Sequence, residues 1–181
     1  MSAINCIITS SCYLHITSNN TIYGTQYNKF PEVKSDSGIL VADMSSDILS
    51  RSIDISQFGV IYAGAQKNIG PAGVTLVIIR DDLIGNEYRD IPTMLNYKTH
   101  LVKDSMFNTP PVLSVFVVNE TLKWIEDLGG ILEVEKRNIK KAEKLYEEIK
   151  RNSIFTSLVN KEDRSMTVSY THLTLPTTVI V

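Results

Sequence analysis

Three continuous apolar runs rich in β-branched residues constrain the fold of this chain more than any other feature. They span Gly38–Asp43, Gly59–Gly64 and Val74–Ile79, and a more polar run, Tyr13–Thr17, precedes them. Residues that favour turns bound each run, such as the Ser18–Asn20 cluster after the first. Continuous rather than alternating hydrophobicity indicates strands that are buried on both faces. The sequence therefore predicts the central sheet of an α/β protein.

The last third of the chain changes to a helical period. Thr109, followed by two prolines, predicts a helix with Thr109 as its N-cap and proline at its first position. Gly129 and Gly130 are expected to end this helix. Its apolar face is predicted to consist of Val115, Val118, Leu122 and Ile125.

A second, highly charged helix is predicted to run from about residue 131 to residue 151. A long helix with such a polar outer side often connects a core domain to a smaller one. The residues expected on its apolar face are Ile139, Ala142, Tyr146 and Ile149.

Composition limits the function classes open to this chain. The 181 residues carry 18 Lys and Arg against 20 Asp and Glu, a net charge of −2, and 43% of them are hydrophobic. These are globular values for one domain, or for one and part of a second. The near-neutral balance removes the electrostatic case for a dedicated nucleic-acid binder. No apolar run approaches the roughly 20 residues of a membrane helix, so we expect no membrane partner either.

Cysteine and histidine usage favours a cytoplasmic protein without a metal centre. Two cysteines, Cys6 and Cys12, cannot form a disulfide framework, and no Cys/His spacing resembles a zinc site. The N-terminus has no basic segment ahead of its apolar stretch, so we do not expect a signal peptide. The histidines, His15, His100 and His172, form no triad or metal pair and are interpreted as structural.

The segment Ala63–Gly73 carries the most chemical information. Lys67 follows a predicted strand, lies among small residues and precedes a Gly/Pro turn. Small neighbours let a bulky ligand approach the backbone, and apolar surroundings disfavour the charged form of an amine. A lysine that forms a Schiff base needs such surroundings, because only the neutral amine is nucleophilic. The alternative, which spacing alone favours, is a surface lysine in a β-turn.

Two further positions have a ligand interpretation and a structural one. Asp43 ends a predicted strand, where open α/β sheets bind ligands, and a carboxylate there can hold a positively charged ring nitrogen. The alternative is that Asp43 caps the following segment. Asn108 and Thr109 stand at a predicted helix N-terminus, which attracts phosphate, although the residues taken alone favour simple capping. There is no Walker A motif, because Ala65 stands where its lysine should be, and there is no G-x-G-x-x-G.

Four ordered motifs resemble the phosphoserine aminotransferase family. They are Ser18–Gly24, Val41–Ser46, Gly59–Gly73 and Met106–Pro111, and the resemblance runs from about Tyr13 to Met166. The family contains pyridoxal-phosphate enzymes with the aspartate-aminotransferase fold. The resemblance implies part of its large domain, a mostly parallel sheet flanked by helices, followed by the start of a small domain.

The resemblance also divides the chain. It implies a partial cofactor-binding large domain over residues 1–128, a connecting helix over 129–152 and the start of the small domain over 153–181. From about Thr167 the family pattern stops, and we interpret residues 167–181 as a candidate non-native tail.

The resemblance implies a role for each candidate residue around the cofactor pyridoxal 5'-phosphate. Lys67 would form the Schiff base and later act as general base. Asp43 would pair with the protonated ring nitrogen, so that the ring can act as an electron sink. Thr21 would hydrogen-bond the cofactor, and Gln66 would help to bind its phosphate.

The implied assembly and reaction involve more than these residues. Asn108 and Thr109 would reach the cofactor phosphate of the partner subunit, so the enzyme would be a homodimer with a shared active site. The implied reaction is transamination between L-glutamate and 3-phosphohydroxypyruvate, giving O-phospho-L-serine and 2-oxoglutarate in serine biosynthesis. Chains of this family are much longer than this one. The alternatives are therefore an inactive fragment, or a phosphate-binding α/β module in which Lys67 is only an electrostatic contact.

Overall fold

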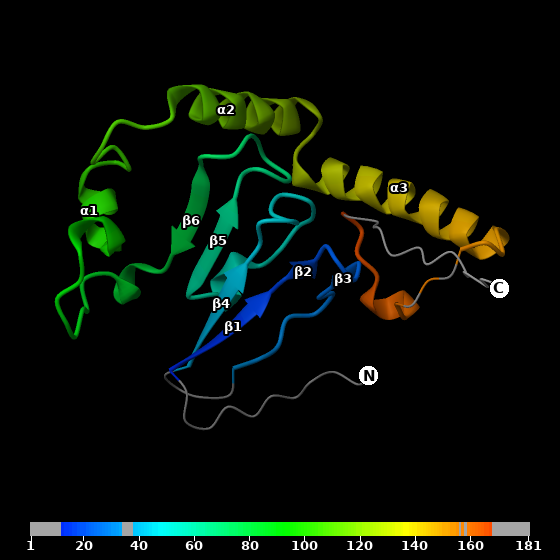
Figure 1. Ribbon diagram of the computed structural model, residues 1–181, viewed down its shortest axis with the longest axis horizontal. Helices are drawn as coiled ribbons and strands as arrows, with labels where there is room; N and C mark the ends of the chain where they lie inside the picture. Colours follow the sequence, from blue (N-terminus) through cyan, green and yellow to red (C-terminus); the bar gives the residue numbers. More distant parts are fainter. Residues whose placement is uncertain (1–11, 34–37, 156, 158, 168–181) are drawn as a thin grey trace, which may run out of the picture.

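The computed structural model describes residues 12–33, 38–155, 157 and 159–167. Its central feature is a four-stranded sheet in the order β1-β4-β5-β6 (Figure 1). Strands β1 (Tyr13–Thr17), β4 (Ile39–Asp43) and β5 (Val60–Gly64) are parallel, and β6 (Thr75–Ile79) is antiparallel to β5. The four predicted strands and the mostly parallel sheet are confirmed.

The parallel strands bring three sequence motifs to one edge of the sheet. Thr17 pairs with Asp43, and Asp43 pairs with Tyr62, so β1, β4 and β5 end at nearly the same level. The turns that follow these strands carry Thr21, the residues after Asp43, and Lys67. A short hairpin of β2 (Asn19–Asn20) and β3 (Thr25–Gln26) frames the first of these turns.

Among the described residues, one face of the sheet is packed into the core and the other is more open. Strands β4 and β5 alternate between buried and half-buried residues, and on β6 Thr75 and Ile78 are exposed. The prediction of burial on both faces is therefore wrong for these strands. The buried face packs against apolar residues from the connecting turns, so the core consists of Ile16, Leu40, Ala42, Met44, Ile48, Phe58, Ile61, Ala63, Ala65 and Ile69.

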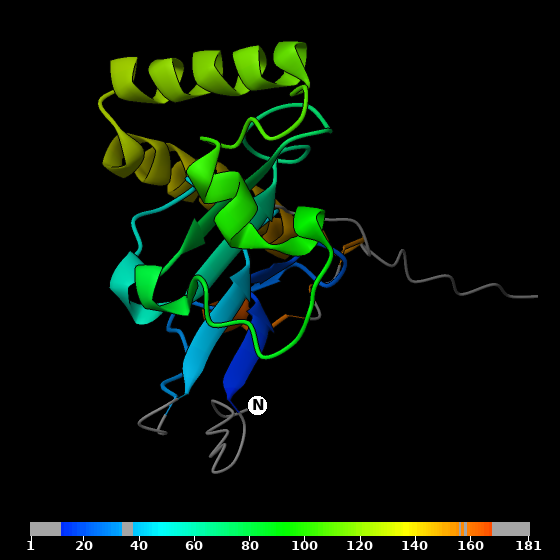
Figure 2. The same ribbon diagram turned by 90° about the vertical axis from the view of Figure 1, so that its left-hand side faces the viewer.

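The helices follow the sheet in the chain. They are α1 (Tyr97–Val102), α2 (Val112–Asp127) and α3 (Ile131–Arg151), and α2 lies beyond the carboxyl end of β5 in both ribbon views (Figures 1 and 2). Short 3-10 turns cover the remaining connections, at Ile55–Gln57, Asp81–Leu83, Thr93–Leu95 and Lys161–Asp163.

The start of α2 differs from the prediction, whereas its end agrees. Pro111 occupies the N-cap position and no side chain caps the helix, so Thr109 is not the N-cap. A residue that precedes proline is held away from helical angles, which keeps Pro110 outside the helix. The helix ends as predicted, because Gly129 and Gly130 adopt φ values of 102° and 83°.

The apolar face of α2 is only partly buried. Ile125 is 8% exposed and Val118 packs against the core, as predicted. Val115 and Leu122 are 46% and 41% exposed, so the prediction is wrong for these two positions.

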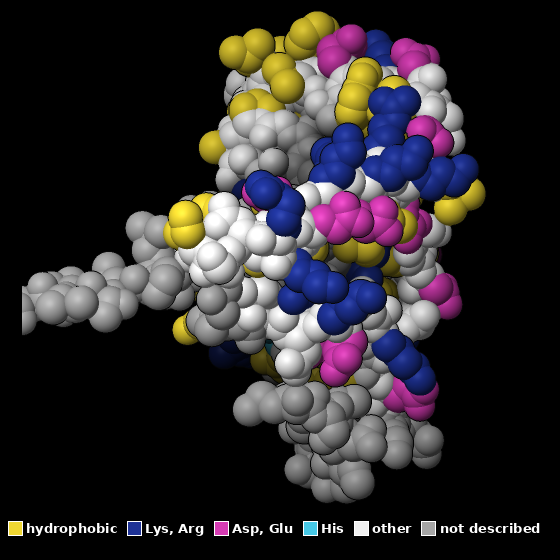
Figure 3. Space-filling view, turned by 90° about the vertical axis from the view of Figure 1, so that its right-hand side faces the viewer, with side chains coloured by type: hydrophobic (Ala, Val, Ile, Leu, Met, Phe, Trp, Pro, Cys, Tyr) yellow, Lys and Arg dark blue, Asp and Glu magenta, His cyan; other side chains and the backbone are white. Residues whose placement is uncertain are grey.

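The predicted bounds of α3 and its half-buried face are confirmed. Two hydrogen bonds attach α3 to the loop after residue 49, from Asn138 Nδ2 to Ser50 O and from Ser52 N to Glu135 Oε2. Lys, Arg, Asp and Glu side chains mix on the side of the molecule where α3 lies (Figure 3). Ion pairs within the helix include Glu133–Arg137 and Glu148–Arg151.

The segment after α3 returns to the hairpin formed by β2 and β3. Arg164 pairs with Thr25 in an isolated antiparallel bridge, and Ser165 N donates to Gly24 O at 2.8 Å.

The domain boundaries predicted around residues 129–152 stay a prediction. Most of the tail interpreted as non-native, residues 168–181, lies outside the described residues, as does Cys6. Within the described ranges, no helix is long and apolar enough to cross a membrane.

Gly70→Ala should destabilise the fold, because its Cβ would lie 2.7 Å from Val118 Cγ2 on α2. Overpacking of this kind costs about 1–3 kcal/mol. We expect the free energy of unfolding in urea to fall by this amount, and to fall less when Val118→Ala is already present. Val115→Ala, at an exposed position of the same helix, is the matched control. An equal cost of Gly70→Ala in all three backgrounds would contradict the packing argument.

Candidate functional site

The first turn at the carboxyl edge of the sheet carries Thr21. Asn20 shapes this turn, since its Oδ1 accepts hydrogen bonds from Ile22 N at 3.0 Å and Tyr23 N at 3.1 Å. Gly24 closes it by donating from N to Asn20 O, with a φ of 67° that favours glycine. Thr21 itself is half-buried at the tip. The turn predicted from the Ser18–Asn20 cluster is therefore confirmed, and Asn20 is the residue that shapes it.

The carboxylate of Asp43 is held in place at the second turn. Its Oδ1 accepts hydrogen bonds from Ser45 N at 2.9 Å and from Ser45 Oγ at 2.6 Å. The same Ser45 Oγ accepts a hydrogen bond from Gly64 N at 3.0 Å. Asp43 therefore does stabilise a local turn, as the structural alternative expected, and Ser45 also connects it to the last residue of β5. Both bonds to the carboxylate end on Oδ1, and Oδ2 takes neither of them.

The third turn presents Lys67 to solvent. Ile69 N and Gly70 N both donate to Ala65 O, at 3.2 and 2.9 Å, and Ala65 and Ile69 are buried. Lys67 itself is exposed, so the predicted apolar surroundings belong to its neighbours and not to the amine. The inward positions of the turn are taken by Ala65 and Ile69, which directs the lysine outward.

Gln66 is also exposed, and its amide folds back over β5. A Cβ built on Gly64 would lie 2.5 Å from Gln66 Oε1. The absence of a side chain at Gly64 therefore makes room for this amide beside the end of the strand.

Asn108 and Thr109 lie apart from this cluster. Both are exposed, and Asn108 Nδ2 donates only locally, to Thr109 O at 3.3 Å. Within the described ranges, no hydrogen bond or ion pair joins either residue to Thr21, Asp43 or Lys67.

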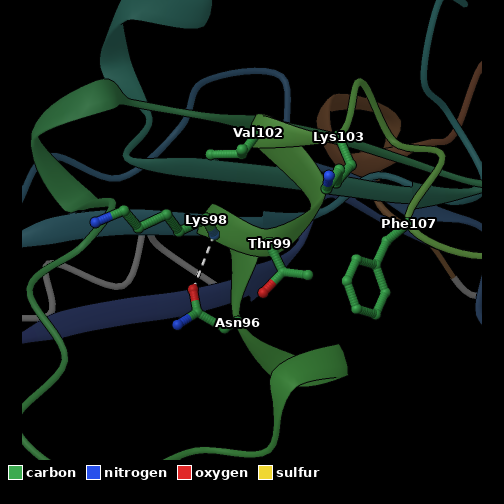
Figure 4. Close-up of a pocket in the computed structure, with 6 residues that line it drawn as sticks. All are labelled: Asn96, Lys98, Thr99, Val102, Lys103 and Phe107. Atoms are coloured by element: carbon green, nitrogen blue, oxygen red, sulfur yellow. Dashed lines mark hydrogen bonds between the residues drawn. The ribbon is translucent and has the colours of Figure 1, made fainter.

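A shallow pocket of about 230 Å³ lies beside α1 (Figure 4). None of the predicted site residues lines it. Its walls are formed by Asn96, Lys98, Thr99, Val102, Lys103 and Phe107.

Beneath the first two turns lies a buried carboxylate that the sequence did not reveal. Asp47 accepts hydrogen bonds from Ser18 Oγ and, at 3.1 Å, from Gln26 Nε2, and it forms an ion pair with Arg51 at 3.6 Å. Burial raises the pKa of Asp47, against the opposing effects of Ser18, Gln26 and Arg51. Burial also lowers the pKa of the Arg51 guanidinium, which lies 5.3 Å from the centre of the Phe30 ring.

The network around Asp47 ties the Thr21 turn to Asp43. Ser18 N donates to Asp43 O at 3.0 Å, and the Ser18 hydroxyl lies within hydrogen-bond distance of both Asp47 Oδ1 and Asp43 O. Beside it, Asn19 Nδ2 donates to Ser46 Oγ at 2.9 Å. These bonds therefore fix the Thr21 turn relative to Asp43.

The comparisons with known proteins define the class of this chain. The family model of class V aminotransferases matches residues 2–176, and the chain belongs to this family. Curated relatives are phosphoserine aminotransferases. The one from Parabacteroides distasonis is 58% identical over 160 residues, which cover 88% of this chain and 44% of the relative. The one from Azobacteroides pseudotrichonymphae is 56% identical over 156 residues, which cover 86% of this chain and 43% of the relative.

Solved structures agree with this family and fold. Phosphoserine aminotransferase from Bacillus circulans subsp. alkalophilus superposes with a TM-score of 0.80 at 48% identity, over 85% of this chain and 42% of that one. The pyridoxal-phosphate-bound enzyme from Trichomonas vaginalis gives 0.80 at 37% identity with the same coverage. The family and fold expected from the resemblance are confirmed. The chain spans less than half the length of the relatives it matches.

The buried carboxylate should make stability depend on pH. Because the folded-state pKa of Asp47 is raised above its ordinary 3.8, its contribution to stability is fully present below about pH 3.8 and declines as pH rises through the folded-state pKa. The Asp47→Asn variant lacks this titration. We therefore expect the free energy of unfolding of the parent, minus that of the Asp47→Asn variant, to fall as pH rises from about 4 in urea titrations.

Asp54→Asn is a control with the opposite sign. Asp54 is exposed and its hydrogen bonds from Ser56 lower its pKa, so its contribution is lost as pH falls. Parallel pH profiles for the two variants would contradict the assignment of Asp47 as a buried, destabilised charge.

Proposed function

We propose that this chain carries the cofactor-lysine portion of a phosphoserine aminotransferase. The reaction is the transfer of an amino group between L-glutamate and 3-phosphohydroxypyruvate, with O-phospho-L-serine and 2-oxoglutarate as products. The observation that carries the proposal is the convergence of Thr21, Asp43 and Lys67 on three adjacent turns at one sheet edge, in a chain 58% identical to a phosphoserine aminotransferase.

The residue types at this edge fit pyridoxal 5'-phosphate. The Asp43 carboxylate, oriented through Oδ1 by Ser45, suits a protonated ring nitrogen. Lys67 is exposed at this edge, so its amine is accessible to the cofactor aldehyde, and the amide of Gln66, folded over Gly64, suits a phosphate oxygen. The hydroxyl of Thr21, at the tip of its turn, suits an oxygen of the ring. When bound, the cofactor supplies an electron sink for the substrate α-carbon.

Three residues of this chain have distinct proposed roles in cofactor binding and proton transfer. Lys67 would hold the cofactor aldehyde through Nζ, and the same amine, when free, would take a proton from the substrate α-carbon. Asp43 would favour the protonated ring nitrogen by placing a negative charge beside it. Ser45 holds that carboxylate, so its orientation does not depend on the ligand.

The proposed assembly is a homodimer in the cytoplasm. Asn108 and Thr109 are exposed just ahead of α2, which leaves them available to the cofactor phosphate of a partner subunit. The exposed apolar side chains of α2 favour a buried environment in a larger assembly. They include Val112, Leu113, Phe116 and Trp124. The free, exposed thiol of Cys12 suits a reducing compartment.

Covalent capture tests this proposal. Adding pyridoxal phosphate to the purified chain should give a visible absorption band, and borohydride reduction should fix the cofactor on Lys67 in peptide maps. Lys67→Arg keeps the positive charge but should lose the label completely. Lys98→Arg, on α1, is the matched control and should keep it.

Each other outcome has a distinct meaning. Label spread over surface lysines, unchanged by Lys67→Arg, would contradict the proposal. Phosphate-dependent binding without reduction onto lysine would favour the non-covalent module. Specific labelling of Lys67 without transamination between glutamate and the phosphorylated oxo acid would favour an inactive fragment.

A further inference from the structure

An aromatic pair beside Asp43 takes part in none of the roles described so far. His15 on β1 and Tyr62 on β5 reach toward each other across β4, with 2.9 Å between His15 Nε2 and Tyr62 Oη. Their rings are stacked, with centroids 5.9 Å apart and planes 25° from parallel. This pair lies on the open face of the sheet, away from the core.

Asp43 lies on the same face, on β4, the strand between those that carry His15 and Tyr62. It is directly opposite Tyr62 in the β4–β5 ladder, so both side chains leave the sheet on one side. Burial raises the pKa of Tyr62, and the Asp43 carboxylate and Tyr97 of α1 raise it further. The groups facing Tyr62 are thus His15 from β1, Asp43 from β4 and Tyr97 from α1, while β6 presents Val77. A phenol kept neutral remains a hydrogen-bond donor.

A hydroxyl has a single proton, which decides the direction of the bonds. When His15 donates from Nε2 to Tyr62 Oη, the proton of Tyr62 is available to the Asp43 carboxylate. Ser45 N and Ser45 Oγ already donate to Oδ1 of that carboxylate. A further bond from Tyr62 would restrict the rotation of the carboxylate.

We propose that Tyr62 is a positioning residue for Asp43, and that His15 sets the Tyr62 hydroxyl by donating to it from Nε2. The direction of action is from His15 through Tyr62 to the carboxylate that faces the cofactor ring nitrogen. This inference rests on the proposed function, since Asp43 is placed at the cofactor there. It assigns a role to His15, which the sequence alone had marked as structural.

The first experiment needs no cofactor. The ultraviolet alkaline titration of the chain, minus that of Tyr62→Phe, isolates the phenol of Tyr62. In Asp43→Asn the pKa of Tyr62 should fall, because a facing negative charge is removed. Asp54→Asn, which removes a distant exposed carboxylate, should leave it unchanged. An unchanged titration in Asp43→Asn would overturn the proposal.

The second experiment measures affinity for pyridoxal phosphate. Tyr62→Phe should weaken binding by about three- to tenfold, the effect of one net hydrogen bond, with unaltered thermal unfolding. His15→Leu should weaken it similarly, and His15→Gln, which keeps an N–H donor, should restore it. A His15→Leu/Tyr62→Phe double variant should bind no more weakly than Tyr62→Phe alone. Tyr88→Phe, at a fully exposed tyrosine, is the matched control.

The two experiments separate the failure of this proposal from the failure of the proposed function. Parent-like affinity of Tyr62→Phe, or additive effects of His15→Leu and Tyr62→Phe, would overturn the positioning role. A parent chain that binds no pyridoxal phosphate would contradict the proposed function, and the alkaline titration would then decide alone whether Tyr62 faces Asp43.

Discussion

The hydrogen-bond network of the buried Asp47 carboxylate determines how the turns that carry Thr21 and Asp43 are arranged at the carboxyl edge of the sheet. It joins the end of β1 through Ser18, the hairpin through Gln26 and its own turn through Arg51. Removing a charge from water is costly, so this site is stable only because several donors converge on it. Arg51 is imperfectly satisfied, since its Nε is buried without a partner among the described residues. The turns that carry Thr21 and Asp43 are thereby fixed before any ligand arrives.

Local patterns in the sequence predicted most of the fold. The four strands, the bounds of α3 and the end of α2 each follow from hydrophobic period or from glycine chemistry, which are local properties. The predicted start of α2 was wrong because two consecutive prolines delay the beginning of the helix. Burial on both faces of the sheet was wrong because burial depends on which elements pack across a strand, and a strand's own residues do not contain that information.

The candidate site was predictable to a lesser degree. Asp43 and Lys67 could be named as candidates because strand ends and small-residue turns carry their own signatures, and the family resemblance implies a chemistry for each. Asp47, Ser45 and Tyr62 were missed because their roles arise from contacts between segments that are far apart in the sequence. Ser18 and Asp47, for example, are 29 residues apart. No periodicity or spacing rule reports such a meeting.

The return of the chain after α3 has a consequence for the order in which the molecule assembles. Ser165 bonds Asn19 across 146 residues, and Met166 N bonds Gln26 across 140. Contacts of such separation carry a large loop-closure entropy and form late. On the ribosome, the hairpin around Thr21 emerges long before the segment that braces it. A nascent chain would therefore be able to pair β1, β4, β5 and β6 before the segment that secures this hairpin has been synthesised.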